Sequence, residues 1–204
     1  IGLLLCPAVY LHGAEPADST LRLMEEITVA ANRQQDVKMN VPQQVYILSR
    51  AQIERANAPT AADLLTTDGL LTVQKSQQGG GSPMIRGFES SRVLLVMDNV
   101  KMNNLIYRAG HLQNIITVDP SILERVEVLY GPSSVSYGSD ALGGVVAFRS
   151  KNPVLGDGGK TWFSGNAFMR YGSANQETTG HVDFNIGGER FASLTSLSYS
   201  NFGD

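Results

Sequence analysis

Short apolar runs separated by turn and capping residues predict a compact unit of strands and short helices in the middle of the chain. Residues 45–48, VYIL, have the β-branched and aromatic composition of a strand. Ser49 with Gln52 then forms a capping box that opens a helix, and Thr60 with Asp63 repeats the device for a second helix. Capped helices next to strands indicate an α+β unit.

The chain continues with a hairpin and two further strands. RVLLVMDNVKMNN predicts a hairpin whose two-residue turn is Asp98-Asn99, since both residues tolerate positive φ. Asp119 is expected to cap a short helix, and strands follow at 125–130 and 144–150. These elements extend the α+β pattern to residue 150.

One face of this sheet is predicted to carry charges. Arg125, Glu127 and Arg149 alternate with apolar neighbours along their strands, so they point to the face opposite the apolar one. Such a face is either solvated or packed against another wall of the protein.

The last part of the chain has the pattern of membrane strands. Segments 160–172, 177–188 and 190–201 are predicted as three antiparallel strands joined by short turns. The middle segment alternates strictly between apolar and polar positions, which is the lipid-out and lumen-in period of outer-membrane strands. The apolar positions are Val182, Phe184 and Ile186, and the polar positions are His181, Asp183 and Asn185.

Composition indicates a chain rich in turns, with no electrostatic reason to bind nucleic acid. Of its 204 residues 21 are glycine, 42% are hydrophobic and 17% are charged, and the net charge is −3. Residues 1–14 have the character of a signal-peptide remnant, an apolar run that contains Cys6, the only cysteine of the sequence. Once that run is removed, disulfides and thiol catalysis are both excluded.

The glycine-rich stretch GGGSPMIRG does not read as a phosphate loop. Gly79, Gly80 and Gly81 are followed by Ser82-Pro83 without a lysine, and an apolar strand comes next instead of a helix. The sequence contains no Ser/His/Asp set, no motif of paired carboxylates and no Cys/His metal spacing. We therefore expect no enzyme activity and no cofactor.

Four motifs, in order, carry a resemblance to a known family. EITVAA, VYILSRAQIERANAPTAADLL, GGGSPMIRGFESSRVLLVMDNVKMNN and LERVEVLYGPSSVSYGSDALGGVVAF together resemble the plug domain of TonB-dependent outer-membrane receptors. The resemblance implies an α+β plug domain, a small mixed sheet with short helices, followed by the first antiparallel strands of a truncated transmembrane β-barrel. The chain departs from the family at Asp98-Asn99, where Asp-Gly is usual, and at Tyr130, where arginine is common.

The resemblance also implies a domain organisation and a location. We expect a signal-peptide remnant at 1–14, an N-terminal tail at 15–40, the plug domain at 41–155 and three barrel strands at 160–204. Since a receptor barrel has many more strands than three, the chain is expected to be a fragment cut at both ends. Its expected location is the outer membrane of a Gram-negative bacterium, with the N-terminus in the periplasm.

The N-terminal tail is expected to contain the TonB box, the segment on which the inner-membrane TonB complex pulls. An extended segment can lend its backbone donors and acceptors to a strand of the periplasmic C-terminal domain of TonB. The alternative is a disordered leader with a chance apolar core. The expected box consists of Glu26, Ile27, Thr28, Val29, Ala30 and Ala31.

Two further sets of residues follow from the resemblance. Residues 77–84 and 102–114 are expected to form apical loops that meet the cargo. The expected plug-to-barrel contacts are polar, and in this chain the residues that make them should lie exposed. The ligand apex comprises Gln78, Gly79, Gly80, Gly81, Ser82, Tyr107, Arg108 and His111, and the plug-to-barrel interface comprises Arg86, Arg125, Glu127 and Arg149.

The expected function is active import of a scarce iron-containing nutrient, heme or a ferric siderophore, by TonB-transmitted energy. NNLIYRAGHLQN resembles the heme and siderophore branch, where His111 either ligates heme iron through a neutral imidazole or only forms hydrogen bonds. The expected partners are TonB, an iron chelate, heme or a heme-carrying protein, and outer-membrane lipid, without nucleic acid. The alternatives are a receptor for cobalamin or another non-iron nutrient, and a non-transporting binding or signalling receptor.

Overall fold

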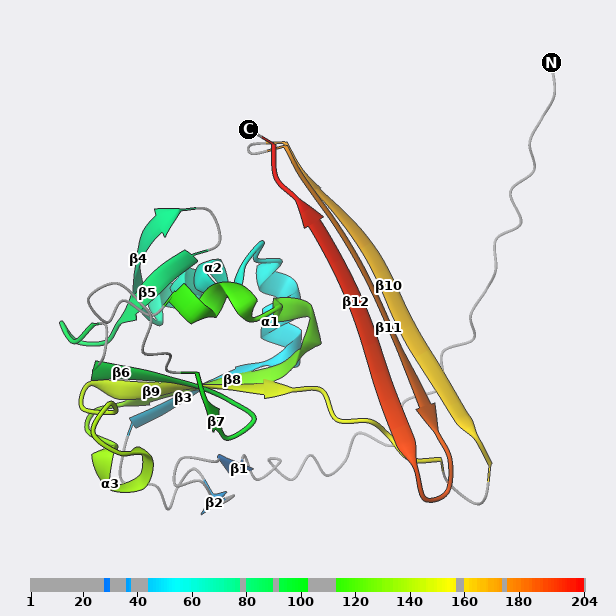
Figure 1. The fold of residues 1–204 in the computed structure, drawn as a ribbon, viewed down its shortest axis with the longest axis horizontal. Coiled ribbons are helices and arrows are strands. Elements are labelled where there is room, and N and C mark those ends of the chain that lie inside the picture. Colours follow the sequence, from blue (N-terminus) through cyan, green and yellow to red (C-terminus); the bar gives the residue numbers. More distant parts are fainter. Residues whose placement is uncertain are drawn as a thin grey trace, which may run out of the picture.

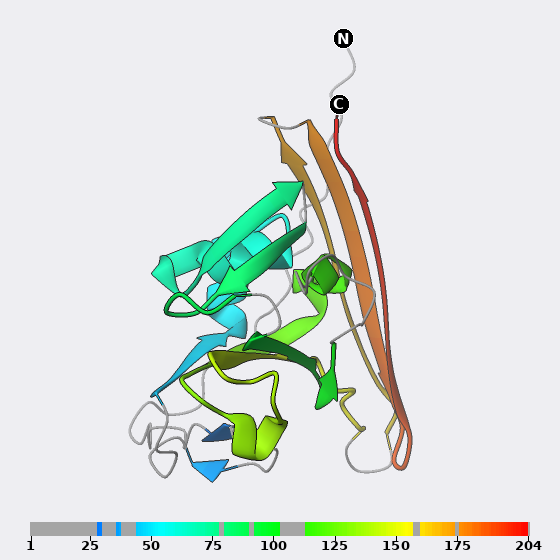
Figure 2. The ribbon, with the colours of Figure 1, turned by 60° about the vertical axis from the view of Figure 1, so that its left-hand side comes forward.

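The protein folds into two bodies that stand side by side. A computed structural model describes residues 28–29, 36–37, 44–77, 80–89, 92–102, 113–156, 160–173 and 176–203. Strands β3 to β9 and their helices form the first body, which we name the α+β unit. Strands β10 to β12 form the second, the outer sheet, which runs along one side of the unit in both views (Figures 1 and 2). Residues 151–156 lead from the unit towards the outer sheet.

The strands of the α+β unit are interleaved with short helices, whereas the outer sheet contains strands alone. In chain order the elements are β1 (Thr28–Val29), β2 (Asp36–Val37), β3 (Gln44–Ser49), α1 (Arg50–Ala56), α2 (Ala61–Thr66), η2 (Thr67–Gly69), β4 (Thr72–Gln77), β5 (Gly80–Met84), β6 (Val93–Met97), β7 (Val100–Lys101), η5 (Gln113–Thr117), η6 (Pro120–Ile122), β8 (Leu123–Tyr130), α3 (Ser134–Tyr137), β9 (Gly144–Ser150), β10 (Trp162–Gly172), β11 (Glu177–Gly187) and β12 (Ala192–Asn201).

A mixed five-stranded sheet forms the centre of the α+β unit. Its order is β3-β8-β9-β6-β7, with β6 and β9 parallel and the other neighbours antiparallel. The strands expected at 45–48, 125–130 and 144–150 are confirmed, and β3 and β8 extend slightly beyond the expected limits. This architecture agrees with the expected α+β fold.

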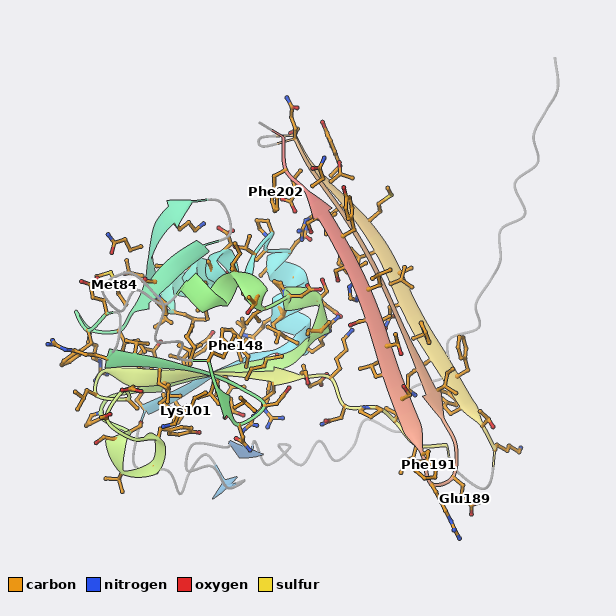
Figure 3. All side chains as sticks on the ribbon, viewed as in Figure 1. Met84, Lys101, Phe148, Glu189, Phe191 and Phe202 are labelled. Atoms are coloured by element: carbon orange, nitrogen blue, oxygen red, sulfur yellow. The ribbon has the colours of Figure 1, made fainter. Side chains whose placement is uncertain are left out.

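The sheet is buried on both faces, because successive side chains of a strand point to opposite sides. On the face covered by α1 and α2, Val146 and Phe148 join a large apolar core. Figure 3 shows Phe148 between the sheet and these helices. On the other face, Val145 and Ala147 pack with Tyr137 of α3 in a second, smaller core.

The expected caps and the expected turn are confirmed. The backbone N–H of Ser49 donates to Gln52 Oε1 at 2.9 Å, which completes the predicted box at the start of α1. The hydroxyl of Thr60 accepts from the backbone N–H of Asp63 at 3.1 Å at the start of α2. The turn between β6 and β7 has positive φ at both central residues, 46° at Asp98 and 70° at Asn99.

The glycine segment is a strand, which corrects the expectation of an apical loop at 77–84. Gly80, Gly81 and Ser82 lie in β5, are buried and pair with β4. Glycine is needed in this strand because the backbone at Gly81 lies very close to β4 and α2. A Cβ placed on Gly81 would lie 2.5 Å from Cγ1 of Val73 and 3.6 Å from the Cβ of Ala62.

The outer sheet is antiparallel in the order β10-β11-β12, which confirms the three expected strands. Each strand has 10 or 11 residues, the length that a tilted strand needs to cross a bilayer. Glu189 and Phe191 mark the β11–β12 turn at one end of the sheet, and Phe202 marks the other end (Figure 3). Among the described residues, no helix is long and apolar enough to cross a membrane.

Candidate functional site

The candidate site is the seam where the inner face of the outer sheet meets the α+β unit. The predicted alternation of β11 is confirmed, since Val182, Phe184 and Ile186 point away from the unit and are 50%, 38% and 46% exposed. The opposite row of β11 is polar and buried. It consists of Glu177, Thr179, His181, Asp183 and Asn185.

Arg170 of β10 connects the two bodies at one end of the seam. Its Nε and Nη2 donate to Glu177 Oε1 at 3.1 and 2.6 Å, an ion pair within the outer sheet. Its Nη1 donates to the carbonyl oxygen of Ala58 at 3.2 Å. Contacts of 3.5 Å reach Asn57 Oδ1 and the carbonyl oxygen of Pro59. One guanidinium therefore holds the connection between α1 and α2.

A polar cluster around His181 connects the two bodies in the middle of the seam. The ring nitrogens of His181 lie 2.6 Å from Ser198 Oγ and 3.2 Å from Asp183 Oδ2. Ser198 also donates to the carboxylate of Asp119, which belongs to the α+β unit. Lys151 binds Asp183 at 2.6 Å and neutralises one of the two carboxylates. The cluster is thus a hydrogen-bonded chain from β11 through β12 to the start of η6.

The connecting segment 151–156 lies against the inner face of β11 and is held there by hydrogen bonds to its backbone. The side-chain amide of Asn185 accepts from the backbone N–H of Val154 at 2.9 Å and donates to its carbonyl at 3.0 Å. Gly156 N–H donates to Gly188 O at 3.0 Å. Gly187 has no side chain where it faces this segment, and a Cβ there would overlap the Val154 carbonyl.

A cavity of about 440 Å³ lies in the seam between α1 and strands β10 and β11. Its lining is mixed, with charged and amide side chains beside apolar ones. They include Arg50, Ile53, Asn57, Phe168, Arg170 and His181. The polar groups of this mixed lining can bind water, so the seam differs from the apolar core of the α+β unit.

Three of the expected interface residues lie together at one end of the central sheet. Arg125 Nε donates to Glu127 Oε1 at 2.8 Å, and Arg149 Nη2 donates to Asn99 Oδ1 at 3.0 Å. The expected exposure is wrong for Glu127, whose side chain is fully buried. The charged face is also wrong, because apolar residues such as Val145 and Ala147 lie on the same face of the sheet and pack with Tyr137 of α3. Contact of the four residues with a barrel wall stays a prediction.

Arg86, the fourth expected interface residue, lies against Tyr130. Its guanidinium carbon is 5.6 Å from the centre of the Tyr130 ring, within the range of a cation–π contact. Arg86 Nη2 also donates to Gln44 Oε1 at 2.8 Å. The Tyr130 hydroxyl donates to the carbonyl oxygen of Leu70 at 2.8 Å. Tyr130, at the position where the family commonly has arginine, therefore packs against Arg86.

Much of the expected ligand apex and TonB box lies outside the described residues. Among the described members, Thr28 and Val29 form β1 and pair with Asp36–Val37, so this part of the box is extended. The part of the chain that the structure describes has no group of three His, Cys, Asp or Glu side chains suited to a metal ion. The members outside it are Gln78, Gly79, Tyr107, Arg108 and His111 of the apex, and Glu26, Ile27, Ala30 and Ala31 of the box.

Comparison with known proteins decides the family. Residues 37–145, more than half of the chain, match the family model described as TonB-dependent Receptor Plug Domain. The chain belongs to this family. The α+β unit is its plug domain, and the outer sheet is made of antiparallel strands of the transmembrane β-barrel. Receptors of this family lie in the outer membrane of Gram-negative bacteria, and they are transport receptors, not enzymes, that engage small molecules and TonB.

Two sequence relatives and one solved structure illustrate the match. The chain is 33% identical over 151 residues to the vitamin B12 transporter BtuB of Vibrio vulnificus strain YJ016, and 36% over 148 residues to that of strain CMCP6. These alignments cover 72% and 70% of this chain, which spans only 23% and 22% of the two relatives. The pyoverdine outer-membrane receptor FpvA of Pseudomonas aeruginosa PAO1 shares the fold, with a TM-score of 0.70 at 20% identity over 86% of this chain and 24% of that receptor.

Sequence reasoning missed the residues that hold the seam. Arg170, Lys151 and Asp119 were not expected there as contacts, although Asp119 was recognised as a helix cap. The strict alternation of β11 was the available signal, since it marked His181, Asp183 and Asn185 as facing inward. Their partners come from distant segments of the chain, so no local pattern could identify them.

Proposed function

We propose that the receptor containing this chain imports a scarce, bulky nutrient across the outer membrane, using energy that TonB transmits through the segment 26–31. The support is the plug-domain match over residues 37–145 together with relatives that are named transporters. The seam adds a physical argument. A plug that must be held and also rearranged is better served by hydrogen bonds beside a cavity with polar groups in its lining than by a continuous apolar interface.

Cobalamin is the first candidate cargo, and an iron chelate or heme is the second. The observation in favour of cobalamin is the 33% and 36% identity to two receptors named vitamin B12 transporters. The second candidate rests on the sequence around His111 and on its imidazole as a ligand for heme iron. A non-transporting receptor is the third alternative, and it differs from the others by binding cargo without uptake.

The test is equilibrium binding of three probes to the purified full-length receptor, followed by uptake in cells. The probes are cyanocobalamin, hemin and a ferric hydroxamate siderophore. We expect sub-micromolar binding of cyanocobalamin, because family receptors must capture dilute cargo, and accumulation inside energised cells. Binding of hemin or the siderophore alone would contradict cobalamin, and tight binding without accumulation would contradict import.

The heme alternative has a more specific test at His111. If an imidazole ligates the iron, hemin added to the wild-type receptor shifts the Soret band, and His111→Ala abolishes the shift. His181→Gln is a suitable control because the His181 ring is buried in the seam and bonded to Ser198 and Asp183. Equal spectra and equal affinity for wild type and His111→Ala would remove His111 as a ligand.

A further inference from the structure

The contacts across the seam fall into two chemical kinds. Lys151 and Asp183 form an ion pair that bridges the connecting segment and β11, so separating them would leave the largely buried Lys151 ammonium without its carboxylate counter-ion. Arg170 behaves differently. Its carboxylate partner, Glu177, lies on the same outer sheet, and its partners on the α+β unit are neutral oxygens.

Glu177 fixes the orientation of the Arg170 guanidinium. Glu177 is 3% exposed, and its Oε1 accepts from Nε and Nη2 of Arg170 and from the hydroxyl of Thr179 at 2.8 Å. A planar guanidinium that binds a carboxylate through Nε and Nη2 directs Nη1 away from that carboxylate. Here Nη1 meets the carbonyl oxygen of Ala58.

The segment that Arg170 holds is a natural place for local movement. Asn57 ends α1 in the left-handed conformation, with φ of 44°, and Thr60 caps α2 three residues later. Helices of 7 and 6 residues are too short to be stable alone, so their shared connection depends on outside contacts. The seam cavity borders this connection at Asn57 and Ala58.

We propose that Arg170 is a positioning residue through which the barrel wall holds the α1–α2 connection of the plug in place. We also propose that these contacts can break without leaving a charge unpaired, so that the connection can move away from the wall. When the connection moves away, the guanidinium keeps Glu177 as its counter-ion and only hydrogen bonds to neutral oxygens are broken. The connecting segment 151–156, held by Lys151–Asp183 and by Asn185, stays on the wall. The inference rests on the seam geometry alone and is independent of the cargo.

Amide hydrogen exchange of the full-length receptor in detergent tests the proposal. For Arg170→Ala we expect about tenfold faster exchange in residues 55–65, the effect of losing hydrogen bonds from a charged donor. The reporting amides include Asn57, bonded to Glu54 O at 3.2 Å, and Leu64, bonded to Thr60 O at 3.0 Å. Exchange in β9, at 144–150, should stay at the wild-type rate.

Two further variants separate positioning from general stability. Arg170→Lys keeps the charge without the planar fork and should give an intermediate rate. Glu177→Gln should accelerate amide exchange in residues 55–65, because the Arg170 guanidinium loses the carboxylate that orients it. Arg190→Ala, at an exposed arginine in the β11–β12 turn, is the matched control and should leave exchange unchanged.

The outcomes decide the proposal even if one variant folds poorly. Unchanged exchange in residues 55–65 for Arg170→Ala and Glu177→Gln would overturn it. Equal acceleration in residues 55–65 and 144–150 would also overturn it, because Arg170 would then support the whole receptor. If Arg170→Ala does not assemble into a heat-resistant barrel, Arg170→Lys and Glu177→Gln give the answer by the same comparison.

Discussion

Tyr130 shows how one side chain can serve packing, hydrogen bonding and charge at once. Its ring lies beneath the Arg86 guanidinium, and its hydroxyl donates to the Leu70 carbonyl, which links β8 to the segment before β4. Burial raises the pKa of the Tyr130 phenol, Tyr46 raises it further, and Arg86 acts in the opposite direction. The neutral phenol is therefore the form that the folded plug prefers.

Replacing Tyr130 with phenylalanine should destabilise the plug and change its response to alkaline pH. The loss of one hydrogen bond should lower the free energy of local opening by about 1 kcal/mol, measured by amide exchange in the full-length receptor. Since the folded pKa is raised, wild-type stability is complete below the unfolded value of about 10 and falls as pH rises through the folded pKa.

The variant Tyr130→Phe lacks this titration, so its stability should fall less than that of wild type above pH 10 or so. Tyr171→Phe, on the exposed side of the outer sheet at 70% exposure, serves as a control and should match wild type. Parallel alkaline profiles for wild type and Tyr130→Phe would show that the phenol is not the titrating group.

At the scale of elements, the β4–β5 hairpin depends on a missing side chain. Gly81 sits opposite Lys75 in the register, and its Cα faces Val73 and Ala62 of α2. A glycine cluster suggests a turn when only the sequence is read. In the folded plug Gly81 allows β5 to approach β4 and α2 more closely than any residue with a side chain would permit.

We expect Gly81→Ala to destabilise this hairpin by about 1–3 kcal/mol, because the added methyl overlaps Cγ1 of Val73, which cannot swing away freely. Gly80→Ala is the matched control, since a Cβ at Gly80 meets nothing within 4 Å. Amide exchange of β4 and β5 measures both variants. If the two substitutions cost the same, close packing at Gly81 is not the cause.

At the scale of the whole molecule, the plug is held from one side by the barrel wall and, by our proposal, pulled from its N-terminal tail. Val29 lies in β1, which pairs with Asp36–Val37, so the described part of the expected box is already extended. Proline has no backbone N–H to donate and fixes φ, so it interrupts pairing with a partner strand.

Val29→Pro in the full-length receptor should therefore lower energised uptake of cargo by about tenfold or more and leave surface binding unchanged. Val29→Thr keeps the backbone donor and a β-branched side chain, and should retain uptake. Both are measured with labelled cargo in energised and de-energised cells. Normal uptake by the proline variant would remove the box assignment from this segment.

The amino-acid sequence by itself determined most of the elements of the plug, the three strands of the outer sheet and the direction in which the side chains of β11 point. The caps at Ser49 and Thr60, the turn at Asp98-Asn99 and the alternation of β11 depend on neighbours within a few residues, so local patterns predict them. The family motifs also consist of short segments, so the plug domain could be recognised from the sequence without its structure.

Only the tertiary structure decided which of these elements meet and what their polar residues do there. Arg170 reaches Ala58 across 112 positions of the chain, and Ser198 reaches Asp119 across 79. Glu127 is buried and Gly81 is packed because of segments that lie elsewhere in the sequence. Such contacts depend on how whole sheets dock, and no local period or propensity contains that information.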